Sequence, residues 1–106
     1  MKAEIENRVQ VVDVFYGGRL LTHIDISYGK LVEFLGAPNI GSDGYKVDAE
    51  WQILFDGVPL SIYNYKDGKN YNGADGLPVE EIRDWHIGGE NKAKAVEFVE
   101  FMENWK

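Results

Sequence analysis

The chain contains no cysteine among its 106 residues. Disulfides, thiolate zinc sites and cysteine nucleophiles are therefore excluded. Small secreted domains usually carry disulfide bridges, because a small core alone gives them too little stability. The absence of cysteine therefore favours a cytoplasmic protein.

Long apolar segments and a surplus of positive charge are also absent. No apolar run approaches the roughly 20 residues that a bilayer-spanning helix needs, and residues 1–6 lack the apolar stretch of a signal peptide. Lysine and arginine number 11 against 18 aspartates and glutamates, which gives a formal charge of −7. This charge argues against direct binding of nucleic acid or of a membrane. It permits a basic protein partner, or a small phosphorylated ligand held by backbone N–H groups and lysine.

Aromatic residues are plentiful, with three tryptophans, six tyrosines and five phenylalanines. The length suits a single domain that covers residues 1–106. Such a domain buries some rings in its core and leaves others for contact with a ligand. No internal repeat, low-complexity block or linker divides the chain.

Four segments carry the alternation and the β-branched residues that predict strands. The segment 8–15 is followed by Gly17-Gly18 and by a second strand over 19–26, which predicts a hairpin. The clearest strand covers 46–55, because its apolar residues alternate with acids and an amide. A tight turn at Asp-Gly then leads into a strand over 58–65.

Two helices are predicted from their capping residues. Ser27 is a good N-cap for a short helix over 28–35, and Gly36 follows where a left-handed residue ends a helix. Asn91 is a cap for a final helix that ends near Asn104, in which apolar residues recur at helical spacing.

The remaining segment combines a loop, a turn and a strand. Residues 66–77 form a polar, glycine-rich loop of a length that is often functional. A helical turn is predicted over 78–82 and a short strand over 84–87, closed by Gly88-Gly89. The sequence therefore predicts an α+β fold with an antiparallel sheet of about five strands. A short helix follows the first hairpin, and a C-terminal helix packs on one face.

Two segments, 63–66 and 84–89, carry side chains suited to a ligand. If their strands are neighbours, the tyrosines and the indole offer ring faces, lysines neutralise phosphate, and the imidazole and glycines donate hydrogen bonds. The glycines could also form an anion-binding nest ahead of the last helix. A simpler alternative is that the aromatics are ordinary sheet residues and the glycines only turn the chain. The predicted ligand-binding residues are Tyr63, Tyr65, Lys66, Lys69, Trp85, His86, Gly88 and Gly89.

Other chemistry has less support. His23 and Asp25 share a strand face, and His86 is the second of two histidines, but no ligand-rich spacing accompanies them. We therefore predict no metal site and no cofactor. The loop 67–76 fails the calcium pattern, because a lysine and a tyrosine occupy positions that require oxygen ligands. No serine lies in a Gly-x-Ser-x-Gly elbow, and no phosphate-binding loop motif occurs.

Four stretches together carry a resemblance to known proteins: 31–38, 46–51, 62–66 with Ile-Tyr-Asn-Tyr-Lys, and 84–89 with Asp-Trp-His-Ile-Gly-Gly. They resemble a group of small proteins encoded by bacteriophages. The resemblance covers most of the chain, and the Trp-His-Ile-Gly-Gly segment is its most distinctive part. It implies a role in the cytoplasm of a host cell, acting on host machinery or host immunity.

The resemblance and the candidate site lead us to expect a protein that counters host defence by binding rather than by catalysis. The expected ligand is a small nucleotide immune signal, which the protein would sequester. Nanomolar sequestration needs about 12 kcal/mol of binding free energy, and a homodimer that encloses the ligand would supply it more readily than a monomer.

Two alternatives remain open from the sequence. The first is an acidic inhibitor of a host nucleic-acid-binding enzyme, of the CRISPR or restriction type. Its interface would use Glu90, Glu97, Glu100 and Glu103 of the last helix, although these acids also suit a solvated helix face. The second is a small phosphodiesterase that degrades the same signal, with His23 or His86 as general acid or base.

Overall fold

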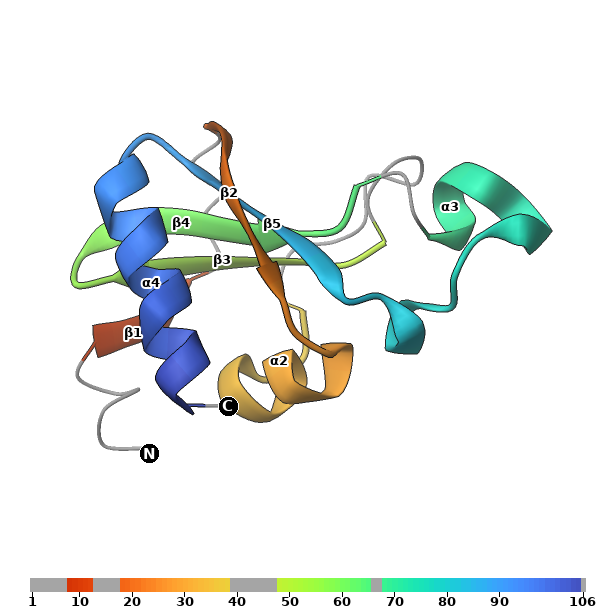
Figure 1. The fold of residues 1–106 in the computed structure, drawn as a ribbon, viewed down its shortest axis with the longest axis horizontal. Helices are drawn as coiled ribbons and strands as arrows, with labels where there is room; N and C mark the ends of the chain where they lie inside the picture. The colour runs from red at the N-terminus through yellow and green to blue at the C-terminus, as the bar shows by residue number, and fades with distance from the viewer. Residues whose placement is uncertain (1–7, 13–17, 39–47, 66–67, 106) are drawn as a thin grey trace.

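A computed structural model describes residues 8–12, 18–38, 48–65 and 68–105. In these ranges, five strands form one antiparallel sheet in the order β1-β3-β4-β5-β2, with helices beside it (Figure 1). The predicted α+β class is confirmed. The strands are β1 (Val9–Val11), β2 (Arg19–Asp25), β3 (Glu50–Phe55), β4 (Val58–Tyr63) and β5 (Asp84–Gly89). The α-helices are α2 (Tyr28–Leu35), α3 (Lys69–Asn72) and α4 (Lys92–Trp105), and short 3-10 turns cover Gly73–Asp75 and Val79–Glu81.

The helix boundaries follow the predicted caps. The Ser27 hydroxyl accepts a hydrogen bond from the Lys30 backbone N–H at 3.2 Å, and Gly36 ends α2 with φ of 85°. The Asn91 side-chain oxygen accepts the N–H of Lys94 at 3.0 Å. Each cap satisfies a backbone donor that the first helical turn leaves without a partner. Hydrogen bonds from nearby side chains therefore determine where both helices begin.

The β3–β4 hairpin also forms at the predicted turn. Asp56 and Gly57 have φ of 52° and 81°, the left-handed pair that a two-residue hairpin turn requires. Phe55 lies opposite Val58 across this turn. The strands are shorter than predicted, since β3 begins at Glu50 and β4 ends at Tyr63.

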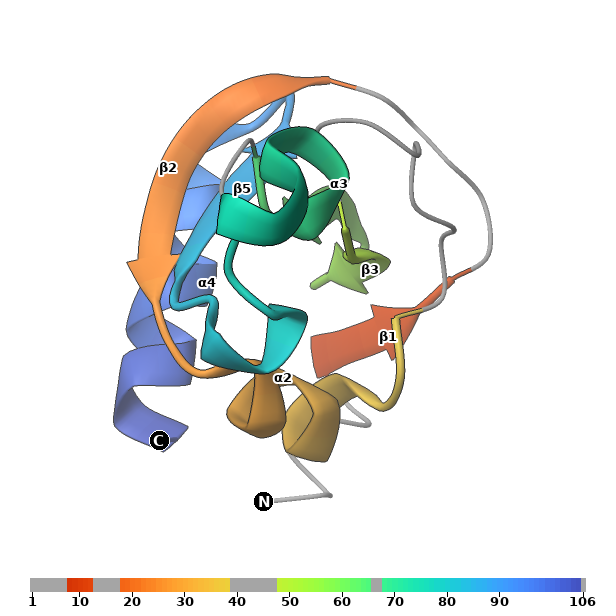
Figure 2. The same cartoon turned by 90° about the vertical axis from the view of Figure 1, so that its right-hand side faces the viewer.

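The predicted hairpin between the first two strands is wrong. β1 pairs with β3 and β2 pairs with β5, so β1 and β2 form opposite edges of the sheet (Figure 2). Gly18 instead serves close packing: a Cβ there would lie 2.6 Å from the Gly89 Cα. A glycine pair between two strands is a local signal, whereas strand order depends on which pairings bury most apolar area. The other glycine of the predicted turn, Gly17, lies outside the described residues.

The segment 66–77, which was predicted as a loop, contains short helical elements. Helix α3 and the 3-10 turn at Gly73–Asp75 occupy residues 69–75. The predicted helical turn near residues 78–82 is confirmed as a 3-10 turn at Val79–Glu81. Figure 1 shows α3 at one end of the molecule, beyond the start of β5.

The core lies between one face of the sheet and helices α2 and α4. Phe55 of β3 and Phe98 of α4 meet with ring centroids 5.3 Å apart, and Phe34 of α2 meets Phe101 of α4 at 5.9 Å. Among the described helices, none has the length and apolar character to cross a bilayer. Side chains of a strand alternate between faces, so the residues between the core positions of β2, β4 and β5 point to the second face.

Candidate functional site

The sheet register brings the two predicted ligand-binding segments together. Tyr63 of β4 lies opposite His86 of β5, and His86 lies opposite His23 of the edge strand β2. The predicted adjacency of the tyrosine segment and the histidine segment is therefore confirmed. Both histidines of the chain meet at this position.

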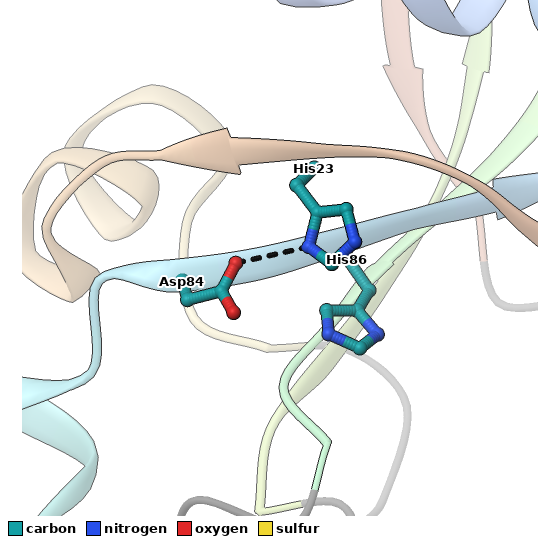
Figure 3. A group of neighbouring side chains, drawn as sticks. All are labelled: His23, Asp84 and His86. Atoms are coloured by element: carbon teal, nitrogen blue, oxygen red, sulfur yellow. Dashed lines mark hydrogen bonds and ion pairs between the residues drawn. The ribbon is translucent and has the colours of Figure 1, made fainter.

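His86 lies at the centre of a polar group on the second face of the sheet. Its ring centroid is 4.5 Å from that of His23, 5.4 Å from that of Tyr63 and 5.8 Å from that of Tyr65. Asp84 adds a carboxylate, whose Oδ1 lies 3.0 Å from His23 Nδ1 (Figure 3). We call these five residues the histidine–tyrosine cluster.

The cluster is open to solvent on its outer side. The side chains of His23 and Asp84 are 51% and 66% exposed, Tyr65 is exposed and His86 is half-buried. Burial, with a further contribution from Glu50 and Tyr65, raises the pKa of Tyr63. A phenol is neutral at physiological pH even with its ordinary pKa, so Tyr63 has a proton to donate, and the raised pKa extends this to more alkaline conditions.

Trp85 does not belong to this open face. Its side chain is fully buried in the core, with its ring 5.5 Å from Trp51 and 6.2 Å from Tyr28. The prediction that Trp85 offers a ring face to a ligand is wrong. Alternation along β5 explains this, because Trp85 shares its face with the buried Ile87 and not with His86.

The two glycines also serve packing within the sheet. Both are buried inside β5, between β4 and β2. A Cβ on Gly88 would lie 2.8 Å from Ser61 Oγ and 3.1 Å from a ring carbon of Tyr63. The close approach predicted for Gly88 and Gly89 is thus made by the protein's own side chains and backbone. The prediction that they contact a ligand or form a nest does not fit this burial.

The predicted cations are not placed at the cluster. Lys66 lies outside the described residues, and Lys69 is an exposed residue at the start of α3, the helix that Figure 1 shows beyond the sheet. Two described acids lie at the rings: Asp84 in the cluster and Glu50, which lies opposite Tyr63. Electrostatically, these residues favour a cation over an anion.

Asp84 is the cluster residue that the sequence reading did not select. Asp25, which was considered with His23, accepts a hydrogen bond from Arg83 Nε at 3.0 Å. Asp84 stands two residues before His86 and therefore shares its face of β5. The spacing was visible in the sequence, but its pairing with His23 depends on strands 61 residues apart.

The acids of α4 are only partly available to a protein partner. Glu97 accepts hydrogen bonds from Arg8 and Lys94 at 2.6 and 3.2 Å. Glu90, which was predicted on the last helix, lies before α4 and 3.6 Å from Arg19. Glu100 and Glu103 are exposed. The acidic-inhibitor alternative therefore keeps a smaller charged surface than the sequence suggested.

Comparison with known proteins adds no assignment to this geometry. No protein-family model matches the chain, and neither the curated proteins nor the solved structures that were searched give a match. The resemblance to bacteriophage proteins stays a prediction.

Proposed function

We propose that this is a binding protein that holds a small nucleotide against the histidine–tyrosine cluster without transforming it. The observation that carries the proposal is the convergence of Tyr63, Tyr65 and His23 on His86, on a solvent-accessible part of the sheet. Rings of this kind bind bases by stacking, and imidazole and phenol groups donate hydrogen bonds.

Each group has a distinct part in the proposed complex. The exposed ring of Tyr65 stacks on the base. His23 and His86 donate hydrogen bonds to phosphate or ribose, and the neutral phenol of Tyr63 donates another. Asp84 and Glu50 repel a phosphate at the cluster, so the proposal needs a cation, and Lys66, which follows Tyr65 directly in the sequence, is the one proposed.

The biological role that we propose comes from the resemblance to small bacteriophage proteins. Such a protein would counter host defence in the host cytoplasm by sequestering a nucleotide immune signal. One open face of a sheet covers only part of a ligand, so tight sequestration would need a second copy to enclose it.

Binding is tested by native mass spectrometry of the untagged protein against cyclic and ADP-ribose-type nucleotides, followed by titration of any bound compound. We expect Tyr65→Ala to weaken binding about tenfold or more, since one stacked base contributes about 1–3 kcal/mol. The matched control is Tyr71→Ala, which removes an exposed tyrosine of α3. An absence of binding across the panel, or equal loss in both variants, would contradict the proposal.

Contact between the two imidazoles favours one second candidate. A pair of histidines 4.5 Å apart can divide the roles of general acid and general base in phosphodiester cleavage. The same mass spectra distinguish this activity, because a phosphodiesterase would convert the nucleotide to products of different mass. Turnover lost in both His23→Ala and His86→Ala would establish the enzyme in place of the binding protein.

A further inference from the structure

We infer that His23, Asp84 and His86 form a binding site for a divalent transition metal of the zinc type. Each residue offers one ligand atom, and the three atoms lie within 4.8 Å of one another (Figure 3). Two imidazoles and one carboxylate come from two adjacent strands, which are paired along the register His23–His86 and Asp25–Asp84. The backbone therefore holds all three residues in place before any metal arrives.

The spacing of the ligand atoms is close to what a metal requires. Zinc bonds to nitrogen and oxygen are about 2.0–2.2 Å long and tetrahedral, so two ligand atoms lie about 3.3–3.6 Å apart. His23 Nδ1 and Asp84 Oδ1, at 3.0 Å, are already near this spacing. A modest rotation of an exposed side chain would close the remaining distance to His86.

The donor set selects the class of metal. Imidazole nitrogen suits zinc, copper, nickel and iron, whereas calcium and magnesium prefer sites made of oxygen. Three protein ligands leave at least one coordination position open to water or to another molecule. Nearby acids, with the formal charge of −7, favour a cation here.

The proposed metal site does not depend on the proposed nucleotide. It shares His23 and His86 with the proposed nucleotide complex, but it rests on the positions of the ligand atoms alone, and its test contains no nucleotide. Loss of one proposal therefore leaves the other intact.

The direct test is a titration of the untagged protein with zinc chloride, followed by calorimetry and by NMR of the histidine rings. Because the chain has only two histidines, every imidazole signal belongs to the site. We expect one zinc ion per chain and a shift of both imidazole signals. A shift of one ring alone, no heat of binding, or one ion per two chains would overturn the site.

Variants then assign the ligands. We expect His23→Ala and Asp84→Asn each to weaken zinc binding by about tenfold or more, because even outer-shell changes at metal sites cost 10–100-fold. Asp25→Asn is the matched control. It removes a carboxylate from the strand of His23, and this carboxylate accepts a hydrogen bond from Arg83 rather than contributing to the proposed site. Equal weakening by Asp25→Asn and Asp84→Asn would mean general attraction by acids and would contradict the ligand set. Thermal unfolding checks that each variant is folded.

Discussion

Trp51 and Trp85 are both buried in the core, but they differ in the hydrogen bonding of the indole nitrogen Nε1. Both indoles are fully buried, and their ring centroids lie 5.5 Å apart. Trp51 Nε1 donates a hydrogen bond to the carbonyl oxygen of Gly36 at 2.9 Å. Trp85 Nε1 has no acceptor among the described residues. A buried donor without an acceptor lowers stability, because its hydrogen bond to water is lost without replacement.

Substitution of each indole by phenylalanine separates this effect from packing. Both changes remove a similar volume from one cluster. Trp51→Phe also removes a hydrogen bond, whereas Trp85→Phe removes a donor that has no acceptor within the described part of the chain. We expect Trp85→Phe to lower the free energy of unfolding by about 1–2 kcal/mol less than Trp51→Phe. Urea unfolding followed by far-UV circular dichroism measures the difference. An equal or larger cost for Trp85→Phe would contradict it.

The alternation of polar and apolar residues along β5 explains why the prediction for Trp85 was wrong. In Asp84-Trp85-His86-Ile87 the polar and apolar residues alternate, which assigns Trp85 to the face of Ile87. The functional interpretation selected the ring for its chemistry and set the alternation aside. His86 and Tyr63 were selected correctly as neighbours, because the alternation leaves them on the polar face of paired strands.

Strand β5 needs glycine at residue 88, where it lies between β4 and β2 in the sheet. Gly88 lies opposite Ser61 of β4 and opposite Leu20 of β2. The Ser61 hydroxyl and the Tyr63 ring occupy the space that a side chain on Gly88 would take. The position of the Tyr63 ring beside His86 thus depends on the missing side chain of residue 88.

The pair Gly88–Ser61 can be tested by a double-mutant cycle. Gly88→Ala places a methyl group 2.8 Å from Ser61 Oγ, and such overpacking costs about 1–3 kcal/mol. Ser61→Ala removes that hydroxyl, so we expect the double variant to recover part of the loss. The free energies of the four proteins give the coupling. Strict additivity would contradict the β4–β5 register.

Elements with local signals were predicted well, and the order of the strands was not. The caps of α2 and α4 and the Asp56-Gly57 turn each depend on residues within four positions of one another. The pairing of β1 with β3 joins residues more than 40 positions apart, and nothing in either segment encodes that choice alone. The same limit hid the pairing of His23 with Asp84.

At the scale of the whole molecule, a charged network joins three distant parts of the chain. Arg8, beside β1, bonds Asp56 of the β3–β4 turn at 2.8 Å and Glu97 of α4 at 2.6 Å. Lys94 of α4 bonds Asp56 at 2.9 Å. The Arg8 guanidinium also lies 4.6 Å from the centre of the Phe55 ring. The network connects the sheet edge, the hairpin turn and the C-terminal helix.

Asp56 is the residue whose charge this network depends on most. Hydrogen bonds from Arg8 and then Lys94 hold the pKa of its carboxyl well below the ordinary value of 3.8. The stabilisation that this lowered pKa gives the fold is fully present above the pKa that Asp56 has in the unfolded chain. It is lost as pH falls from there toward the pKa of Asp56 in the native state. Arg8 and Lys94 are charged throughout that acidic window even at their ordinary pKa values, and their hydrogen bonds to Asp56 and Glu97 raise those values further.

Asp56→Asn should therefore lose stability in a manner that depends on pH. Asparagine tolerates the φ of 52° at this turn, so the substitution removes the charge and keeps the hairpin. We expect the deficit in unfolding free energy, relative to the natural chain, to be constant at neutral pH and to shrink as pH falls below about 4. Asp75→Asn, which removes an exposed acid from a 3-10 turn, is the control for the loss of one charge. A deficit that persists unchanged down to pH 2, or one equal to that of Asp75→Asn at neutral pH, would show that the network does not depend on the charge of Asp56.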